Sequence, residues 1–399
     1  MNLIVLPDSL LVLILLYLER EKTSQWYTLS RVTKKWKLNR FAAFMKPCVS
    51  SSTLRNLHDW NALARLKIQD IGTKCDTNTN TIMKMLHVRE CTLQILTPYP
   101  SQWFIPPRTE CLRLVCGKLE DCKTIQLVNW PVTIHSLMLH EMNFEVVGFP
   151  YKVVHAVQQL RQLIIRHRFT SFFNREWLTY ATRLRVLSLD SIHARPSLSS
   201  TLTKLTHLQL SGNIALESFA ALTFYPRLHT LHITLDKLEY FDPGHLITLV
   251  ALNKLQISNM SFTSSFFVCL SALTRLQELS VINCVNCGDL HDLVQNGTNL
   301  LTLGINRLHV YKTRVMTRMT CLFKIRELAL FDCFPQSILA FESLLCLQKL
   351  TICWTRGTTL TQELKNNINI LRTACPLMTI TILQDVNLCT QPFFKDSFF

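Results

Sequence analysis

LTHLQL at residues 205–210 is followed by LHTLHI at 228–233, LNKLQI at 252–257 and LQELSV at 276–281. Each copy holds three apolar residues, the second three positions and the third five positions after the first. The last two alternate with polar residues, which is the pattern of a strand that buries one face. Because the copies recur every 23 or 24 residues, the sequence predicts stacked strands that share one core.

The same pattern extends over most of the chain. We find 14 copies at a mean spacing of about 24 residues, counted by the middle apolar residue of each copy. These middle residues are Leu66, Leu86, Leu112, Leu137, Leu163, Leu187, Leu208, Leu231, Leu255, Leu279, Leu303, Leu328, Leu350 and Ile380. The residues after a strand have helix-like apolar spacing, as in FFVCLSAL at 266–273. We therefore expect strand–helix repeats.

The repeat resembles that of leucine-rich-repeat proteins. The resemblance covers residues 57–385 and implies an α/β solenoid, a horseshoe with a parallel sheet on its concave face. Cys91, Asn213, Cys284 and Cys333 are assigned to the Asn/Cys position of that repeat, three residues after the last apolar residue of the strand. Cys284 and Cys287, with His291, also have the spacing of part of a zinc site, but no second cysteine pair lies nearby. We expect no metal and no cofactor, and reduced, buried thiols.

The first 46 residues lack the repeat. LPDSLL at 6–11, ILLYL at 14–18 and LSRVTKKW at 29–36 resemble an F-box, the helical module that docks on a Skp-type adaptor. Pro7 suits the first turn of a helix, and apolar residues at helical spacing leave a second apolar face to be covered. By resemblance, the adaptor-binding residues are Leu6, Pro7, Leu10, Leu11, Ile14, Leu15, Leu18, Val32 and Trp36.

These patterns divide the chain into four parts: an all-α F-box at 3–46, a linker at 47–56, the solenoid at 57–385 and a tail at 386–399. A helical cap for the solenoid is the alternative for the first part. An uncleaved membrane anchor is the other alternative, although the apolar run at 10–18 is shorter than a bilayer span. The tail carries four phenylalanines, which either fold back over the last repeat or form a docking peptide.

The net charge of +15 concerns partners more than fold. We expect the first half of the concave face to bind an acidic or phosphorylated protein, because arginine makes bidentate contacts with carboxylate and phosphate. An ordinary solvated face is the alternative. The candidate residues are Arg65, Lys67, Arg89, Arg113, His140 and Arg166. Later repeats are expected to be neutral on this face, apart from Glu278, Glu327 and Lys349 as an isolated cation.

No phosphate loop, metalloprotease motif or nucleophile elbow is present in the sequence, so we expect no catalytic residues. The F-box resemblance implies a substrate receptor that binds a Skp-type adaptor and, through it, a cullin–RING ubiquitin ligase. The alternative is a binding scaffold or inhibitor outside ubiquitin transfer. We expect neither nucleic acid nor membrane as a partner, and a cytoplasmic or nuclear location. Nucleic-acid binding would rest on charge alone.

Overall fold

The computed structural model describes residues 48–50, 65–71, 89–95, 103–104, 107–116, 127–128, 132–140, 155, 157–166, 176–192, 198–214, 217–263, 266–287, 299–306, 324–331, 346–354, 362–374 and 376–384. The chain divides into two compact units, Met1–Ala194 and Arg195–Phe399, called unit 1 and unit 2 below. The expected F-box at 3–46 and tail at 386–399 lie outside the described residues.

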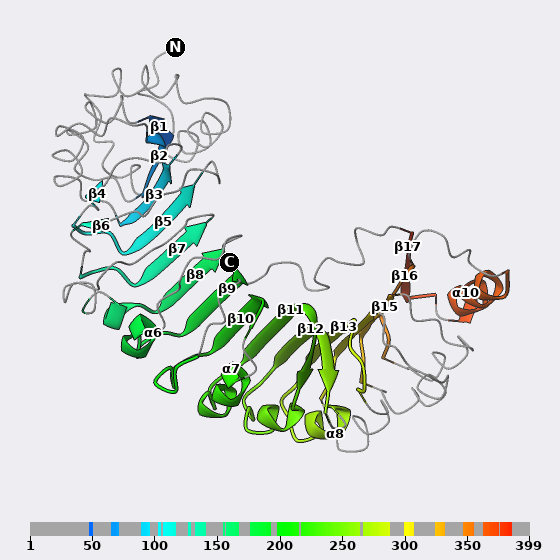
Figure 1. Cartoon of the computed structure of the whole chain (residues 1–399). Helices are drawn as coiled ribbons and strands as arrows, with labels where there is room; N and C mark the ends of the chain where they lie inside the picture. The colour runs from blue at the N-terminus through cyan, green and yellow to red at the C-terminus, as the bar shows by residue number, and fades with distance from the viewer. Residues whose placement is uncertain are drawn as a thin grey trace, which may run out of the picture. The chain divides into compact units, whose positions relative to one another are not determined.

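Unit 1 is built on parallel strands that follow one another in chain order (Figure 1). Each pairs with the next along the sequence, except that β4 and β6 form a small sheet of their own. The strands are β1 (Cys48–Ser50), β2 (Arg65–Ile71), β3 (Glu90–Ile95), β4 (Trp103–Phe104), β5 (Cys111–Cys116), β6 (Leu127–Val128), β7 (Ser136–His140), β8 (Gln162–Arg166) and β9 (Val186–Ile192). Its helical segments include α6 (Glu176–Tyr180), and residues 155 and 157–159 are also helical.

Unit 2 repeats the arrangement with eight parallel strands in chain order. They are β10 (His207–Gly212), β11 (Thr230–Phe241), β12 (Lys254–Phe262), β13 (Glu278–Ile282), β14 (Thr302–Asn306), β15 (Glu327–Phe331), β16 (Lys349–Trp354) and β17 (Thr379–Gln384). The described helical segments are α7 (Glu217–Ala220), the 3₁₀ turns η4 (Ala221–Phe224) and η5 (Pro243–Leu246), α8 (Phe266–Leu270) and α10 (Gln362–Ala374). Each unit is thus a parallel-sheet solenoid of the leucine-rich-repeat type.

The apolar positions of the repeat lie in register in the core. Leu231 pairs with Leu255 and Leu255 with Leu279, and all three side chains are fully buried. Burying a leucine stabilises a fold by about 1.5–3 kcal/mol, so a ladder of such residues is the main source of stability. The middle apolar residues that we predicted from Leu208 to Leu350 occupy this ladder, and Ile380 of the last repeat is in register with it but only half-buried.

One predicted copy is wrong. We expected Leu86 to be the middle residue of the second strand, but β3 begins at Glu90, and Cys91 pairs with Leu66 and Leu112. Cys91 is buried and takes the place of a leucine, as a small apolar side chain. Its assignment to the Asn/Cys position is therefore wrong too. The prediction failed because Met83, Leu86 and Val88 have the repeat spacing, while the strand itself has cysteine at its first core position.

The sheet begins earlier than residue 57. β1 lies within 47–56, the range expected to be a linker, and Val49 pairs with Ile68 of β2. The segment therefore adds a strand to the solenoid, instead of separating it from what precedes.

Backbone hydrogen bonds join successive repeats at the start of the strands. There, one carbonyl group accepts hydrogen bonds from two N–H groups of the next repeat. In unit 2, the His229 carbonyl accepts from Asn253 and Lys254 at 2.8 and 3.0 Å, and the Asn253 carbonyl accepts from Gln277 and Glu278 at the same distances. The Arg89 carbonyl does the same for Glu110 and Cys111 in unit 1. This repeated contact keeps equivalent residues of neighbouring repeats at equivalent places.

Most connections are short. We expected helices between strands, but α6, α7 and α8 have only five, four and five residues. A repeat of about 24 residues leaves little chain for a longer helix after the strand and its two turns. Phe266 and Phe267 of α8 and Phe262 of β12 are buried, with the Phe262 and Phe266 rings stacked at 4.2 Å. In the described part of the chain, no helix is both long and apolar enough to cross a membrane.

Three residues on or beside strands of unit 2 have positive φ, a conformation that glycine and asparagine tolerate. They are Gly212 (111°) at the end of β10, Asn259 (60°) within β12 and Asn283 (49°) directly after β13. The side-chain Nδ2 of Asn283 donates to the side-chain Oδ1 of Asn259 at 2.7 Å, and Nδ2 of Asn259 donates to the Leu235 backbone carbonyl. An asparagine ladder thus ties three repeats together, one position before the expected Asn/Cys position.

Candidate binding face

The polar residues of each strand form one face of the sheet. In β10 the core residues Leu208 and Leu210 alternate with half-buried His207, Gln209 and Ser211. On the next strand, the polar-face residue His232 contacts Thr234 through Nε2 and Oγ1 at 3.0 Å. The sheet of each unit therefore has a second face opposite the leucine ladder, which we call the polar face, although it also includes Met138 and Ile164 in unit 1 and Ala329 in unit 2.

The structure brings together three of the six predicted basic residues on the polar face of unit 1. His140 of β7 is in register with Arg166 of β8, and Arg113 lies on the preceding strand β5 opposite Met138. Neighbouring strands are about 4.8 Å apart. We call Arg113, His140 and Arg166 the basic triad.

The pKa of His140 is affected by both arginines of the basic triad. Its pKa is lowered from 6.5 to about 4, first by burial and then by the positive charges of Arg113 and Arg166. The imidazole is therefore neutral at pH 7, between two permanent cations. The basic triad favours the binding of an anion, because the two arginines make the local electrostatic potential positive and the histidine adds a hydrogen-bonding group.

Asp190 is a residue of this region that the sequence interpretation missed. It lies on β9 in register with Arg166 and is half-buried. The alternation from Leu187 and Leu189 places position 190 on the polar face, so the signal was present. Asp190 therefore places a carboxylate on the strand next to Arg166 of the basic triad.

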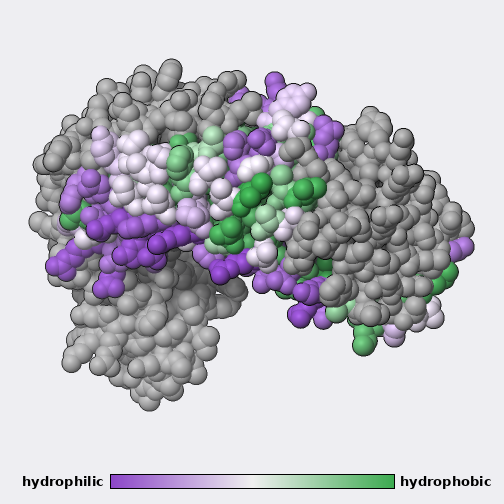
Figure 2. All heavy atoms as spheres, turned by 90° about the horizontal axis from the view of Figure 1, so that it is seen from below, coloured by the Kyte–Doolittle hydropathy of each residue, from purple (hydrophilic) through white to green (hydrophobic). Residues whose placement is uncertain are grey.

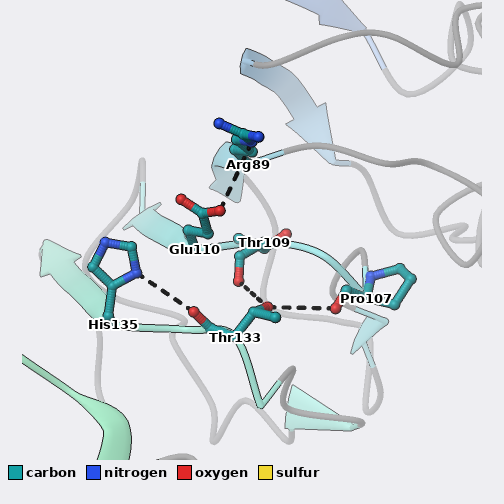
Figure 3. A network of polar contacts seen from close by, with 6 residues as sticks. All are labelled: Arg89, Pro107, Thr109, Glu110, Thr133 and His135. Atoms are coloured by element: carbon teal, nitrogen blue, oxygen red, sulfur yellow. Dashed lines mark hydrogen bonds and ion pairs between the residues drawn. The ribbon is translucent and has the colours of Figure 1, made fainter.

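Arg89 does not join the triad. It precedes β3, and its Nε lies 3.8 Å from Glu110 Oε1 (Figure 3). Figure 3 shows the two side chains pointing toward one another from successive repeats, beside the hydrogen bond from Thr133 Oγ1 to the Thr109 carbonyl at 2.8 Å. The misplacement follows from the wrong second copy, and Thr92 is the residue in register with Arg113.

Arg65 and Lys67 belong to β2, as expected. Lys67 is in register with Thr92, which is in register with Arg113, so the backbone positions of Lys67 and Arg113 are equivalent two strands apart. Arg65 is in register with Glu90. The adaptor-binding residues predicted between Leu6 and Trp36 lie outside the described residues.

The polar face of unit 2 carries balanced charges. Lys254 Nζ lies 3.0 Å from Glu278 Oε2, and Lys349 Nζ lies 3.4 Å from Glu327 Oε2. The expectation that Lys349 is an isolated cation is therefore wrong: the residue one strand before it in register is an acid. The predicted neutral residues Gln256 and Ser258 are on this face and are buried.

The cysteine pair behind the zinc hypothesis is buried in unit 2. Burial raises the pKa of the Cys284 thiol to about 12 and raises that of Cys287 as well. Cys284 Sγ lies 3.3 Å from the Ile282 carbonyl oxygen. Burial thus disfavours the thiolates that bind zinc, and His291 lies outside the described residues. Among the residues that the structure describes, no three His, Cys, Asp or Glu side chains are grouped to hold a metal ion.

No protein-family model matches the sequence, and no curated protein matches it. Solved structures that are similar at low identity include the following three. An internalin (inlF) from Listeria monocytogenes is 17% identical over 63% of this chain and 80% of its own, with a TM-score of 0.34. TLR13, in a TLR13–ssRNA13 complex, is 17% identical over 84% of this chain and 48% of its own, with a TM-score of 0.47.

The plant peptide hormone receptor RGFR1, in complex with RGF2, is 12% identical over 85% of this chain and 69% of its own, with a TM-score of 0.41. The chain spans about half the length of the TLR13 chain. The fold assignment rests on the strand order and register of this chain, and not on these likenesses. A leucine-rich-repeat solenoid of this kind is a scaffold with an extended surface for binding.

Proposed function

We propose that the chain is the substrate-recognition subunit of a Skp–cullin–F-box ubiquitin ligase, located in the cytoplasm or nucleus. The observation that carries the binding part is the basic triad on the polar face of unit 1. The ligase part is supported by the resemblance of residues 3–46 to an F-box. The solenoid supplies a long surface for a protein substrate.

In this proposal the chain has no catalytic residue. The triad binds an acidic or phosphorylated segment of the substrate, because guanidinium groups pair with carboxylate or phosphate through two parallel hydrogen bonds. The F-box binds a Skp-type adaptor, which connects to a cullin–RING core and its charged conjugating enzyme. Holding the substrate there raises the effective concentration of its lysines, and the thioester chemistry belongs to the other subunits.

The ligase part is tested by co-purification. The tagged full chain, the variant Leu10→Asp/Ile14→Asp, and the control Lys237→Gln, which changes an exposed residue of unit 2, are purified from cells and analysed by mass spectrometry. We expect the adaptor and a cullin with the wild type and the control, and their loss in the double variant. If the wild type recovers neither protein, the ligase part of the proposal is wrong. The remaining hypothesis is then that the chain is a binding scaffold or inhibitor.

The binding part is tested separately. The variant Arg113→Gln/Arg166→Gln is compared with Lys237→Gln/Arg372→Gln, which removes the same charge from exposed residues outside the triad. Proximity labelling with and without proteasome inhibition identifies partners that accumulate only under inhibition. We expect the triad variant to lose these partners while keeping the adaptor. Unchanged recovery of the partners would show that the triad does not bind substrate.

A further inference from the structure

Four successive turns of unit 2, which lead into β10, β11, β12 and β13, share one backbone hydrogen bond. In each, the N–H of the first apolar repeat residue donates to the carbonyl three residues before it. The bonds are Leu205 to Leu202 at 3.1 Å, Leu228 to Tyr225 at 3.0 Å, Leu252 to Leu249 at 2.8 Å and Leu276 to Leu273 at 3.0 Å. Equivalent residues of these turns are therefore held at equivalent places.

The turns are basic. The residue before each first apolar residue is Lys204, Arg227, Ala251 and Arg275 in turn, and the three cations are exposed. Residues 199–206, 222–229, 246–253 and 270–277 contain no Asp or Glu. Asp236 and Glu239 lie instead in the second half of β11, and Asp242 directly follows the strand. These four turns therefore carry three cations and no carboxylate, and Glu278 at the start of β13 is paired with Lys254.

Exposed apolar residues lie among these cations. Phe224 is 51% exposed, Ile247 44%, Val250 57% and Val268 48%. Their neighbours Leu246, Leu249 and Leu270 are fully buried, so the exposed side chains are additional to a complete core. Figure 2 shows hydrophobic residues gathered over α7 and α8, bordered by hydrophilic ones. A contiguous exposed apolar group with a polar border is typical of an interaction site.

We propose that this turn surface, formed by Phe224, Arg227, Ile247, Val250, Val268 and Arg275, binds an acidic amphipathic helix of another protein. The turn surface contains none of the residues of the basic triad. This proposal does not depend on the proposed ligase function.

The spacing of the charges fits a helix. Arg227 and Arg275 belong to repeats two strands apart, about 10 Å at 4.8 Å per strand. Carboxylates seven residues apart on a helix are also about 10 Å apart on one face, at 1.5 Å per residue. Apolar residues at the third and fourth positions between them share that face. They would meet Ile247 and Val250, which belong to the repeat between the two arginines.

The apolar residues favour a polypeptide over nucleic acid. Single-stranded nucleic acid binds basic grooves in which aromatic side chains stack on bases. Three of the four exposed apolar residues of this surface are aliphatic: Ile247, Val250 and Val268. Aliphatic side chains match leucine or valine of a partner helix.

The test uses the full chain and a fluorescent helical peptide in which glutamates seven positions apart flank leucines at the third and fourth positions between them. A scrambled peptide of the same composition and poly(U) RNA are the competing probes. We expect the helical peptide to bind at least about tenfold tighter than the scrambled one, because scrambling separates the apolar and acidic contacts. We also expect its affinity to exceed that of poly(U).

Two variants separate the contribution of the arginine charges to peptide binding from that of the apolar side chains. Arg227→Glu/Arg275→Glu should weaken peptide binding by at least about tenfold, since it places like charges opposite each other. Ile247→Thr/Val250→Thr should weaken it by roughly threefold or more, since it removes apolar area with little change of shape. The control Lys237→Glu/Arg372→Glu, with the same change of charge, should stay within about twofold. Circular dichroism verifies that each variant is folded.

Three results would overturn the proposal. Equal affinity for the helical and scrambled peptides would show that only charge is recognised. Unchanged peptide affinity in Ile247→Thr/Val250→Thr would show that these two apolar residues do not contact the helix. Poly(U) binding as tight as the peptide's, and lost on charge reversal, would assign the surface to nucleic acid.

Discussion

At the scale of single residues, the register of the sheet sets the chemistry of His140. Its neighbours Arg113 and Arg166 come from strands 53 residues apart in the sequence. Half-burial removes water from the imidazole, and the two guanidinium groups oppose a further positive charge. A histidine in this setting stays neutral well below pH 6.5.

The low pKa of His140 predicts a pH dependence of stability. The folded pKa of about 4 lies below the value of 6.5 for the unfolded chain, so the unfolded state binds the proton first and stability falls as the pH drops through this window. For this half-exposed group the loss between pH 7 and pH 5 should be about 1 kcal/mol after allowing for solvent screening.

Urea unfolding at both pH values measures the effect. His140→Gln, which does not titrate, should lose less stability between pH 7 and pH 5 than the wild type, and Arg113→Gln should fall between them because one repelling charge is gone. Equal losses for His140→Gln and the wild type would contradict the assignment.

Asn259 allows backbone strain and hydrogen bonding to be separated. Asn259→Ala loses both side-chain contacts and must adopt φ near 60° with an ordinary side chain, so it should cost about 2–4 kcal/mol. Asn259→Gly loses the contacts but tolerates the backbone, and should cost about 1 kcal/mol less than alanine. Chemical denaturation of both variants compares the costs, and an alanine variant as stable as the glycine variant would show that strain plays no part.

At the scale of elements, the leucine spacing predicted the strands and their order, because one strand per repeat must bury two side chains. It failed at β3, where Cys91 takes the core position in register with Leu66 and MKMLHV at 83–88 imitates the pattern. It also overestimated the helices, since buried phenylalanines fill the space beside short turns. The pairing of Lys349 with Glu327 was missed because it joins neighbouring strands, a contact visible only once the register is known.

The segment α8 predicts a contrast between two neighbouring positions. Phe266 is fully buried and stacks on Phe262, whereas Val268 in the same helix is 48% exposed. Phe266→Ala should destabilise the protein by about 3–5 kcal/mol through cavity formation, and Val268→Ala by less than about 1 kcal/mol. Thermal and urea unfolding measure the difference, and similar costs would contradict the placement of the two side chains.

At the scale of the whole molecule, the sequence predicted a solenoid because its repeats are regular. It could not locate the binding surfaces as well, since these depend on which charges become neighbours. Three of the six predicted binding residues meet in the basic triad, Arg89 is paired with Glu110, and the turn surface of unit 2 was not foreseen. Its signal was present in the turns that lead into β10 to β13, where cations occur without carboxylates.

In a solenoid each repeat contacts its neighbours, so damage should remain local. In Phe266→Ala, amide hydrogen exchange should accelerate in β12 and β13 of unit 2, while β7 and β8 of unit 1 keep the protection of the wild type. Hydrogen–deuterium exchange with mass spectrometry resolves these segments. Equal acceleration in all four strands would mean that the chain unfolds as one cooperative block.

The carbonyl groups that accept two N–H groups where each strand begins also give the solenoid a direction. In every such contact the acceptor belongs to the earlier repeat and the donors to the later one, as with His229 and Asn253–Lys254. A chain leaving the ribosome presents its N-terminal part first. Each newly synthesised repeat therefore finds its acceptor already in place, and the solenoid can grow during translation in the order in which it is made.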